Sequence, residues 1–365
     1  RDRGRRRIYP SHSRRRGYTI EPLYIPQTLA NAAQDAIKKG VKMAEDAFAV
    51  SYLRHAMRGA PVINGNTPGC MIAALDALLV TGWGPAAPQS LTVAAGVATA
   101  TFASATPWEV GAVIKISGAT PEAINGKARV LSSSGNTMTF ATNASAGAYA
   151  GAIDIRYCPA DWEKVFSATN KAVYRSKDPL GNRHYLRVDD SANQFARVRG
   201  FEAMSDIDTG VGPFPVDLQI TGGGYWHKSY NASNTQIPYA FVADARTVLV
   251  MVSPGVAAGA GFWQSNVRGF GECKSLNPAG DVYTSFISAN DSNLSYFGSG
   301  ALDVTRFDSS SVSGIFSPRG WSGLGACVRS LSVPMTGGAN SVSGADDYLG
   351  AGPSLIDGEV KIVDE

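Results

Sequence analysis

The sequence has few charged residues. Asp, Glu, Lys and Arg make up 17% of its 365 residues, whereas hydrophobic residues make up 44%. Gly is abundant at 40 residues, and Ser, Thr, Asn and Ala fill much of the remainder. This composition is typical of many short strands joined by tight turns. It also fits a subunit that hides its faces in a large assembly, because interface centres are depleted of charge.

Cysteine pairs and long apolar runs are lacking as well. The Cys residues lie far apart, with no CxxC pair: Cys70, Cys158, Cys273 and Cys327. We therefore predict single buried thiols rather than a metal site or a disulfide framework. No apolar run reaches the roughly 18 residues that a membrane span needs, and the start lacks a signal-peptide pattern. We expect synthesis in the cytoplasm and solubility until assembly.

Complete catalytic signatures are also missing. The His residues are scattered, and none lies in an HExxH motif or beside a GxSxG elbow: His12, His55, His184 and His227. Residues 205–210 contain one Asp-Thr-Gly triplet of the kind that aspartic proteases use. Those enzymes need two carboxylates that share a proton, and a second triplet is absent. A turn closed by Asx hydrogen bonds is the preferred interpretation.

Acidic residues leave two other kinds of site to consider. Calcium could use oxygens from Asp189, Asp190, Asp206 and Asp208, but the spacing of a calcium loop is missing. Glycosidase carboxylates could come from Glu163, Glu202 and Glu272, which no pattern favours. We therefore predict that the protein is not an enzyme and that it has no cofactor and no metal.

Residues 1–28 are rich in arginine. They hold eight Arg within the first 16 residues, three prolines and no apolar periodicity, which predicts an extended arm. We predict partner-binding residues at Arg5, Arg6, Arg7, Tyr9, Arg14, Arg15, Arg16 and Tyr18. Their guanidinium groups suit carboxylates on neighbouring subunits, which is the preferred interpretation. Nucleic-acid phosphates and an exposed arm without a partner are the alternatives.

Residues 29–87 are predicted to form a helical anchoring segment. A helix is expected after Thr28, which can cap it, and Gly40 follows. Residues 70–80, CMIAALDALLV, are apolar almost all round, with Asp76 as the sole charge, and predict a buried helix. Met43 begins a segment typical of a natural start, so residues 1–42 are expected to be an extension.

The remainder predicts a mainly β fold. Residues 88–157 show six short strands, including hairpins about 94–96 and 134–136, which indicates a small sandwich or barrel. Residues 158–365 predict a larger β-sandwich-like domain, with turn-rich linkers such as GVGPFP at 210–215 and a final strand in GEVKIVDE. After a Gly-rich turn, Tyr225 and Trp226 are possible interface aromatics; a place in the core or in a subunit contact is preferred over stacking on sugars.

Six segments, in order along the chain, resemble a family of virion proteins from tailed bacteriophages and prophages. They lie at 52–84, 90–132, 162–176, 184–215, 222–229 and 319–329, and include APVINGNTPGCMIAALDALLVTGWG, HYLRVDDSANQFARVRGFEAMSDIDTGVGPFP and RGWSGLGACVR. The module at 88–157 also looks like small β-modules of phage tail proteins. The arginine-rich arm lies outside the match, and the chain ends earlier than the family usually does.

This resemblance implies a structural role in the virion, in the tail, its baseplate or its tip. It brings no catalytic residues. The implied partners are further copies of the chain and other virion proteins, with a host surface receptor as a further option. Two alternatives remain: a capsid decoration protein, and a receptor-binding adhesin or glycan hydrolase at the tail tip. Nucleic acid is the less favoured partner of the arm.

Overall fold

A computed structural model describes residues 50–106, 108–229, 231–253, 266–272, 285–290, 313–319 and 325–330. Within these ranges the chain is mainly β, which confirms the predicted fold class. The predicted arm, the helix after Thr28 and the final strand lie outside the described residues. None of the described helices is both long enough and apolar enough to cross a membrane.

The small module is a closed six-stranded barrel. Its strands are β3 (Ser90–Ala94), β4 (Val97–Thr101), β5 (Val113–Thr120), β6 (Gly126–Ser134), β7 (Thr137–Ala141) and β8 (Gly147–Tyr157). The order is β8-β3-β4-β7-β6-β5, and β8 also pairs with β5, which closes the ring. A further strand, β2 (Trp83–Ala86), adds to β8, and a short 3₁₀ helix, Glu122–Ile124, follows β5.

Alternating side chains explain why these segments form strands. β3 and β4 alternate between exposed and buried residues, so Leu91, Val93 and Ala98 point into the barrel. The β3–β4 loop is the two residues Ala95 and Gly96, both with positive φ, as a type I′ turn requires. The predicted hairpins, about 94–96 and about 134–136, are therefore confirmed.

Within the described residues the second sheet has thirteen strands, all paired antiparallel. Its strands are β1 (Ser51–Arg54), β9 (Trp162–Ala168), β10 (Lys171–Ser176), β11 (Tyr185–Asp189), β12 (Phe195–Met204), β13 (Gly210–Phe214), β14 (Gly224–His227), β15 (Tyr239–Ala243), β16 (Val248–Val252), β17 (Asn266–Glu272), β18 (Ser285–Asn290), β19 (Ser313–Ser317) and β20 (Val328–Ser330). The main path is β1-β15-β16-β17-β18-β14-β12-β11-β10-β9, with β13 beside β12. Since β1 precedes the barrel and β9 follows it, the barrel is an insertion in this sheet's chain path.

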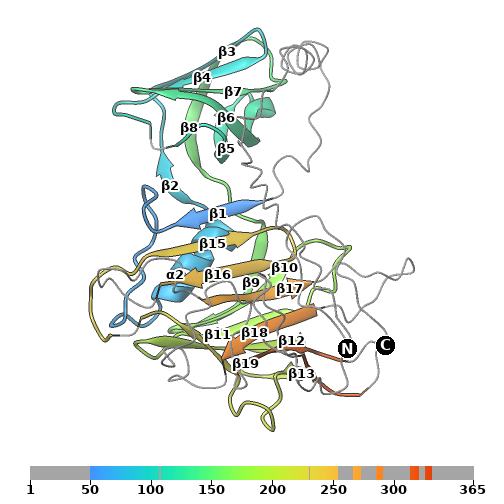
Figure 1. The fold of residues 1–365 in the computed structure, drawn as a ribbon. Helices are drawn as coiled ribbons and strands as arrows, with labels where there is room; N and C mark the ends of the chain where they lie inside the picture. Colours follow the sequence, from blue (N-terminus) through green and yellow to red (C-terminus); the bar gives the residue numbers. More distant parts are fainter. Residues whose placement is uncertain are drawn as a thin grey trace, which may run out of the picture. The chain divides into compact units, whose positions relative to one another are not determined.

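This sheet curls so that its two halves face each other (Figure 1). Trp162 of β9 and Phe214 of β13 each lie 6.1 Å, between ring centroids, from Phe270 of β17. The Trp162 indole also donates a hydrogen bond of 2.8 Å to the carbonyl of Asp244, in the loop after β15. The predicted sandwich-like character of the larger domain follows from this curl.

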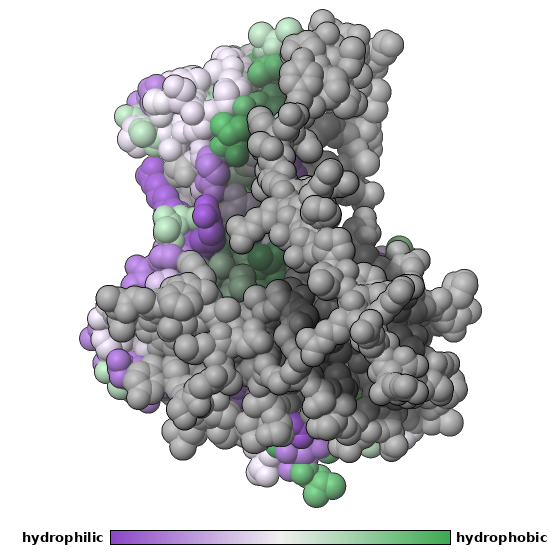
Figure 2. All heavy atoms as spheres, viewed as in Figure 1, coloured by the Kyte–Doolittle hydropathy of each residue, from purple (hydrophilic) through white to green (hydrophobic). Residues whose placement is uncertain are grey.

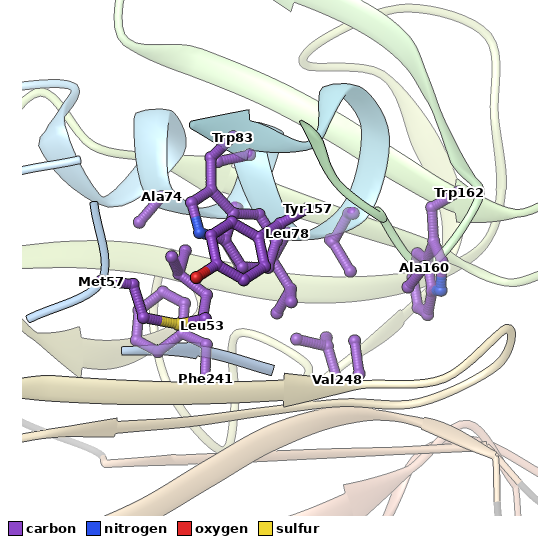
Figure 3. Packing of buried hydrophobic residues seen from close by; sticks show 14 of the residues in the cluster. Leu53, Met57, Ala74, Leu78, Trp83, Tyr157, Ala160, Trp162, Phe241 and Val248 are labelled. Atoms are coloured by element: carbon purple, nitrogen blue, oxygen red, sulfur yellow. The ribbon is translucent and has the colours of Figure 1, made fainter. Parts of the chain in front are cut away.

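The predicted buried helix is present. It consists of α2 (Cys70–Asp76) and a π-helical continuation, η2 (Ala77–Thr81), and ends at Gly82, whose φ is 72°. Leu75, Leu78 and Leu79 are fully buried, whereas Ala73 is exposed, so one edge of the helix reaches solvent. Figure 3 shows Ala74 and Leu78 of the helix among core side chains of β1, β2, β8, β15 and β16.

Three segments differ from the sequence-based expectation. The described part of the predicted helical segment, 50–87, contains strands β1 and β2 besides the helix. Residues 210–214, expected to be a linker, form β13, because β12 is long enough to pair with it beyond β14. Residues 224–227, expected to be the end of a Gly-rich turn and the aromatics after it, form β14 between β12 and β18.

Candidate functional site

The arm residues predicted to bind a partner lie outside the described residues. They are Arg5, Arg6, Arg7, Tyr9, Arg14, Arg15, Arg16 and Tyr18. Tyr225 and Trp226, the other predicted contact residues, lie on β14 and point to opposite faces of the sheet. Trp226 is fully buried and donates a hydrogen bond of 2.8 Å to the Ser288 carbonyl, so within this chain it is a core residue.

Tyr225 is half-buried and its ring is already in contact with neighbours. The Arg197 guanidinium lies 3.9 Å from the ring centroid, and the Phe195 ring packs edge-to-face with Tyr225, with 5.0 Å between the ring centroids. Arg197 also donates to the Tyr225 hydroxyl at 2.5 Å and to the carbonyl of Thr221. Burial lowers the pKa of Arg197. One face of the Tyr225 ring is therefore covered within the chain by Arg197.

The acidic residues at 205–210 form a turn, as preferred from the sequence. The Ser205 amide donates to the Thr209 carbonyl at 3.0 Å, and Asp206 accepts a bond from the amide of Ile207. The Asp208 carboxylate pairs with Lys171 at 2.9 Å and with Arg187, which lowers its pKa. Its oxygens are directed at cations of β10 and β11. No group of three metal-binding side chains exists in the described part of the chain.

A buried ion pair was not anticipated from the sequence. Lys228 Nζ lies 2.5 Å from Asp190 Oδ1, and both side chains are fully buried. Lys228 also donates to the Ala192 carbonyl at 2.7 Å and the Thr67 carbonyl at 3.2 Å. Burial raises the pKa of Asp190 to about 6, against the opposing effect of Lys228. In the sequence, the adjacent acids Asp189 and Asp190 were the only sign of this ion pair, and they had suggested a calcium site instead.

The same carboxylate holds the start of helix α2. Asp190 Oδ2 accepts hydrogen bonds from the amides of Met71 at 2.8 Å and Ile72 at 3.3 Å. The first amides of a helix have no partner within the helix, so a carboxylate there stabilises it. Asp190 therefore joins the helix, the end of β11 and the residue after β14.

The cluster closest to a catalytic arrangement lies between the two halves of the curled sheet. His184 Nδ1 lies 2.8 Å from Ser285 Oγ, and the Asn182 amide nitrogen donates to the same oxygen at 3.2 Å. Burial raises the pKa of Glu272 and lowers that of His184. Ser285 is 1% exposed, so its hydroxyl is shielded from solvent. The Glu272 carboxylate accepts a hydrogen bond of 2.6 Å from the backbone amide of Asn182. This bond holds the loop before β11.

A further polar cluster joins the barrel to β1. The Glu109 carboxylate accepts hydrogen bonds from the hydroxyls of Tyr52 at 2.9 Å and Tyr157 at 2.7 Å. Tyr157 ends β8 and stacks on Trp83 of β2, with 4.8 Å between ring centroids. Burial raises the pKa of Glu109, but the bonds from Tyr157 and Tyr52 outweigh it and leave the pKa below its ordinary value. This cluster connects β1 to the end of β8.

The Cys residues within the described ranges agree with the expectation of single thiols. Cys70 and Cys158 are buried, Cys327 is half-buried, and all three are unpaired. Burial raises the pKa of Cys158 to about 11, which keeps it protonated and unreactive near neutral pH. Cys273 lies outside the described residues.

Comparisons with known proteins do not identify a family for this chain. No protein-family model matches the chain, and no curated protein and no solved structure matches it either.

Proposed function

We propose that this chain is a non-enzymatic structural subunit of a tailed-bacteriophage virion, located in the tail or at its tip. It acts there through assembly in several copies and through subunit contact. The phage assignment is supported by the segments between residues 52 and 329 that resemble virion proteins. The mainly β fold, with a barrel inserted into a larger sheet, is compatible with that role.

The observation that carries the structural part of the proposal is the use of the buried Asp190 carboxylate. It serves Lys228 and two helix amides at once, so it ties together three segments that are distant in the sequence. Glu109 and Glu272 are used in the same way, at the barrel joint and in the loop before β11. Carboxylates that would face a substrate in an enzyme bind groups of the same chain here. This favours a structural role over a catalytic one.

The non-enzymatic part has a direct test. Purified protein is incubated with host capsule and with lipopolysaccharide, and the chain length of the polysaccharide is followed by gel electrophoresis. We expect no shortening, because the carboxylates that a glycosidase would need already bind groups of the same chain: Glu163 pairs with Arg175, Glu202 pairs with Arg319, and Glu272 accepts the backbone amide of Asn182. Any shortening by the purified protein would contradict the proposal, and its loss in a Glu272→Gln variant would identify a hydrolase.

The arm has its own role in the proposal. We infer that residues 1–28 bind carboxylates of neighbouring virion proteins, since guanidinium groups form two-pronged pairs with them. Particles assembled with a chain that lacks residues 1–28 should hold fewer copies or dissociate at lower temperature. Normal occupancy and stability would contradict this role. Binding of the full chain to DNA that weakens steeply with salt would instead favour the nucleic-acid alternative.

A further inference from the structure

The two longest segments of the chain without Asp, Glu, Lys or Arg both contribute to the barrel. They are residues 77–108, between Asp76 and Glu109, and residues 130–153, between Arg129 and Asp154. The barrel order places them side by side, because they supply all of β3, β4 and β7 and the adjoining parts of β6 and β8. The charge-free residues therefore form one continuous side of the barrel.

The charges of the barrel lie on the opposite part of the ring. Lys115 is on β5, Lys127 and Arg129 are at the start of β6, and Asp154 and Arg156 are near the end of β8. Two of these cations are paired: Lys127 with Asp161 at 2.6 Å, and Arg156 with Asp154 at 2.5 Å. The charge distribution around the barrel is thus one-sided, although strands of the same kind make up both sides.

The charge-free side presents rows of small side chains to solvent. One row runs across five strands as Ala148, Thr92, Thr99, Thr139 and Ser132. Within it, the hydroxyls of Ser132 and Thr139 lie 2.6 Å apart. We call this surface the barrel face and define it as Ser90, Thr92, Ala94, Val97, Thr99, Thr101, Ser132, Thr137, Thr139 and Ala148, all exposed or half-exposed. In Figure 2 the visible atoms at the barrel end are mostly pale, which marks intermediate hydropathy.

The chemistry of the barrel face limits the kinds of partner that it can bind. The aromatic residues of these strands, Phe140 and Tyr149, point inward and are buried, as is Phe102 after β4. The face therefore offers no ring for a sugar to stack on and no cation for a phosphate. A surface of small, uncharged side chains suits another uncharged sheet.

We propose that the barrel face is the contact surface for a second copy of this chain, seated face to face. In a two-fold contact each residue near the axis meets its own copy, so a charge there would face a like charge. The barrel face holds none, and small side chains let two sheets approach to about 10 Å. This inference rests on the multi-copy assembly proposed above and names the surface that forms it.

The test compares matched lysine substitutions in the purified full chain. Thr92→Lys places a charge in the middle of the barrel face, whereas Ser117→Lys places one on exposed β5, opposite Asp154. Sedimentation velocity between about 1 and 100 µM covers the affinities expected of a specific interface. We expect the wild type and Ser117→Lys to dimerise alike, and Thr92→Lys to bind at least about tenfold more weakly. Circular dichroism and thermal unfolding check that each variant is folded.

Two results would overturn this inference. The wild type could stay monomeric throughout the range, which includes the case where another segment of the chain covers the barrel face. Alternatively, Thr92→Lys could associate as tightly as Ser117→Lys. Neither result depends on virions, so a monomeric chain that is nevertheless present in particles would defeat the inference and leave the proposed function standing. If the chain dimerised through the barrel face but were absent from virions, the inference would stand and the proposed function would be wrong.

Discussion

Asp190 and Lys228 form an ion pair in which both side chains are fully buried, with 2.5 Å between Asp190 Oδ1 and Lys228 Nζ. Such a pair contributes less to net stability than its short distance suggests, because both charges lose their hydration. Its effect is on specificity, since removal of one partner leaves the other charge buried. The pair thereby fixes how helix α2, the end of β11 and the end of β14 meet.

Single substitutions at this pair should be strongly destabilising. Asp190→Asn leaves Lys228 without its counter-charge and should lower the free energy of unfolding by about 3–5 kcal/mol. The double variant Asp190→Asn/Lys228→Met should cost less than the sum of the two singles, since no charge is left buried. Urea unfolding followed by circular dichroism measures all three. Lys127→Met, which breaks a partly exposed pair, is the control and should cost under about 1 kcal/mol. Additive costs would contradict this account.

Loss of the Glu109 charge should matter only above acidic pH. Hydrogen bonds from Tyr157 and Tyr52 outweigh burial and hold the pKa of Glu109 below its ordinary value. Its contribution to stability is therefore present above the unfolded-state pKa and is lost as the pH falls through the lower folded-state pKa. We expect Glu109→Gln to cost about 1 kcal/mol at pH 7, and this cost to shrink as the pH falls through the folded-state pKa of Glu109. Glu122→Gln, at an exposed site, is the control and should cost under about 0.5 kcal/mol at pH 7. A cost for Glu109→Gln that does not change with pH would contradict the assignment.

Barrel closure predicts a difference between two glycines. At Gly118, with a φ of 74°, an added Cβ would lie 2.2 Å from the Ala152 carbonyl oxygen, where β5 pairs with β8. At Gly135, with a φ of 56°, an added Cβ would meet nothing within 4 Å. Gly135→Ala should therefore cost about 1 kcal/mol from backbone strain alone, and Gly118→Ala clearly more. Equal midpoints in thermal unfolding of the two variants would argue against closure at this point.

Two buried tryptophans should differ in their tolerance of phenylalanine. Trp162 Nε1 donates to the Asp244 carbonyl at 2.8 Å, whereas Trp108 Nε1 has no partner among the described residues. Both side chains are fully buried, so the loss of ring volume is similar. Trp162→Phe should cost about 1 kcal/mol more than Trp108→Phe in urea unfolding, because it alone breaks a hydrogen bond. A larger cost for Trp108→Phe would contradict the assigned indole geometry.

Local patterns predicted the local elements. The alternation in 90–101 and the Gly in its turn indicate the β3–β4 hairpin, and the apolar run at 70–80 indicates the helix. Both depend on neighbours in the sequence. The closure of the barrel was not predictable, because it needs β8 to pair with both β3 and β5 at once. Strand β13 was missed because Gly210, Gly212 and Pro213 are typical of turns, while pairing with β12 overrides that preference.

The candidate sites were harder to anticipate for the same reason. Asp190 and Lys228 are 38 residues apart, and neither lies in a motif, so only the fold brings them together. Trp226 and Tyr225 are adjacent in the sequence, and strand geometry sends one into the core and the other outward. The run of residues without charge from 77 to 108 was visible in the sequence. Its meaning as one side of a barrel came only from strand order.

We propose that the chain is a structural part of a tailed-phage virion. Immunogold labelling of intact particles with antibodies against the purified chain tests it most directly. We predict several gold particles per virion, concentrated on the tail or its tip and absent from virions of an unrelated phage. Labelling of the capsid would move the protein to the head. Intact virions without any label, together with its absence from the proteins of disrupted particles, would contradict the claim.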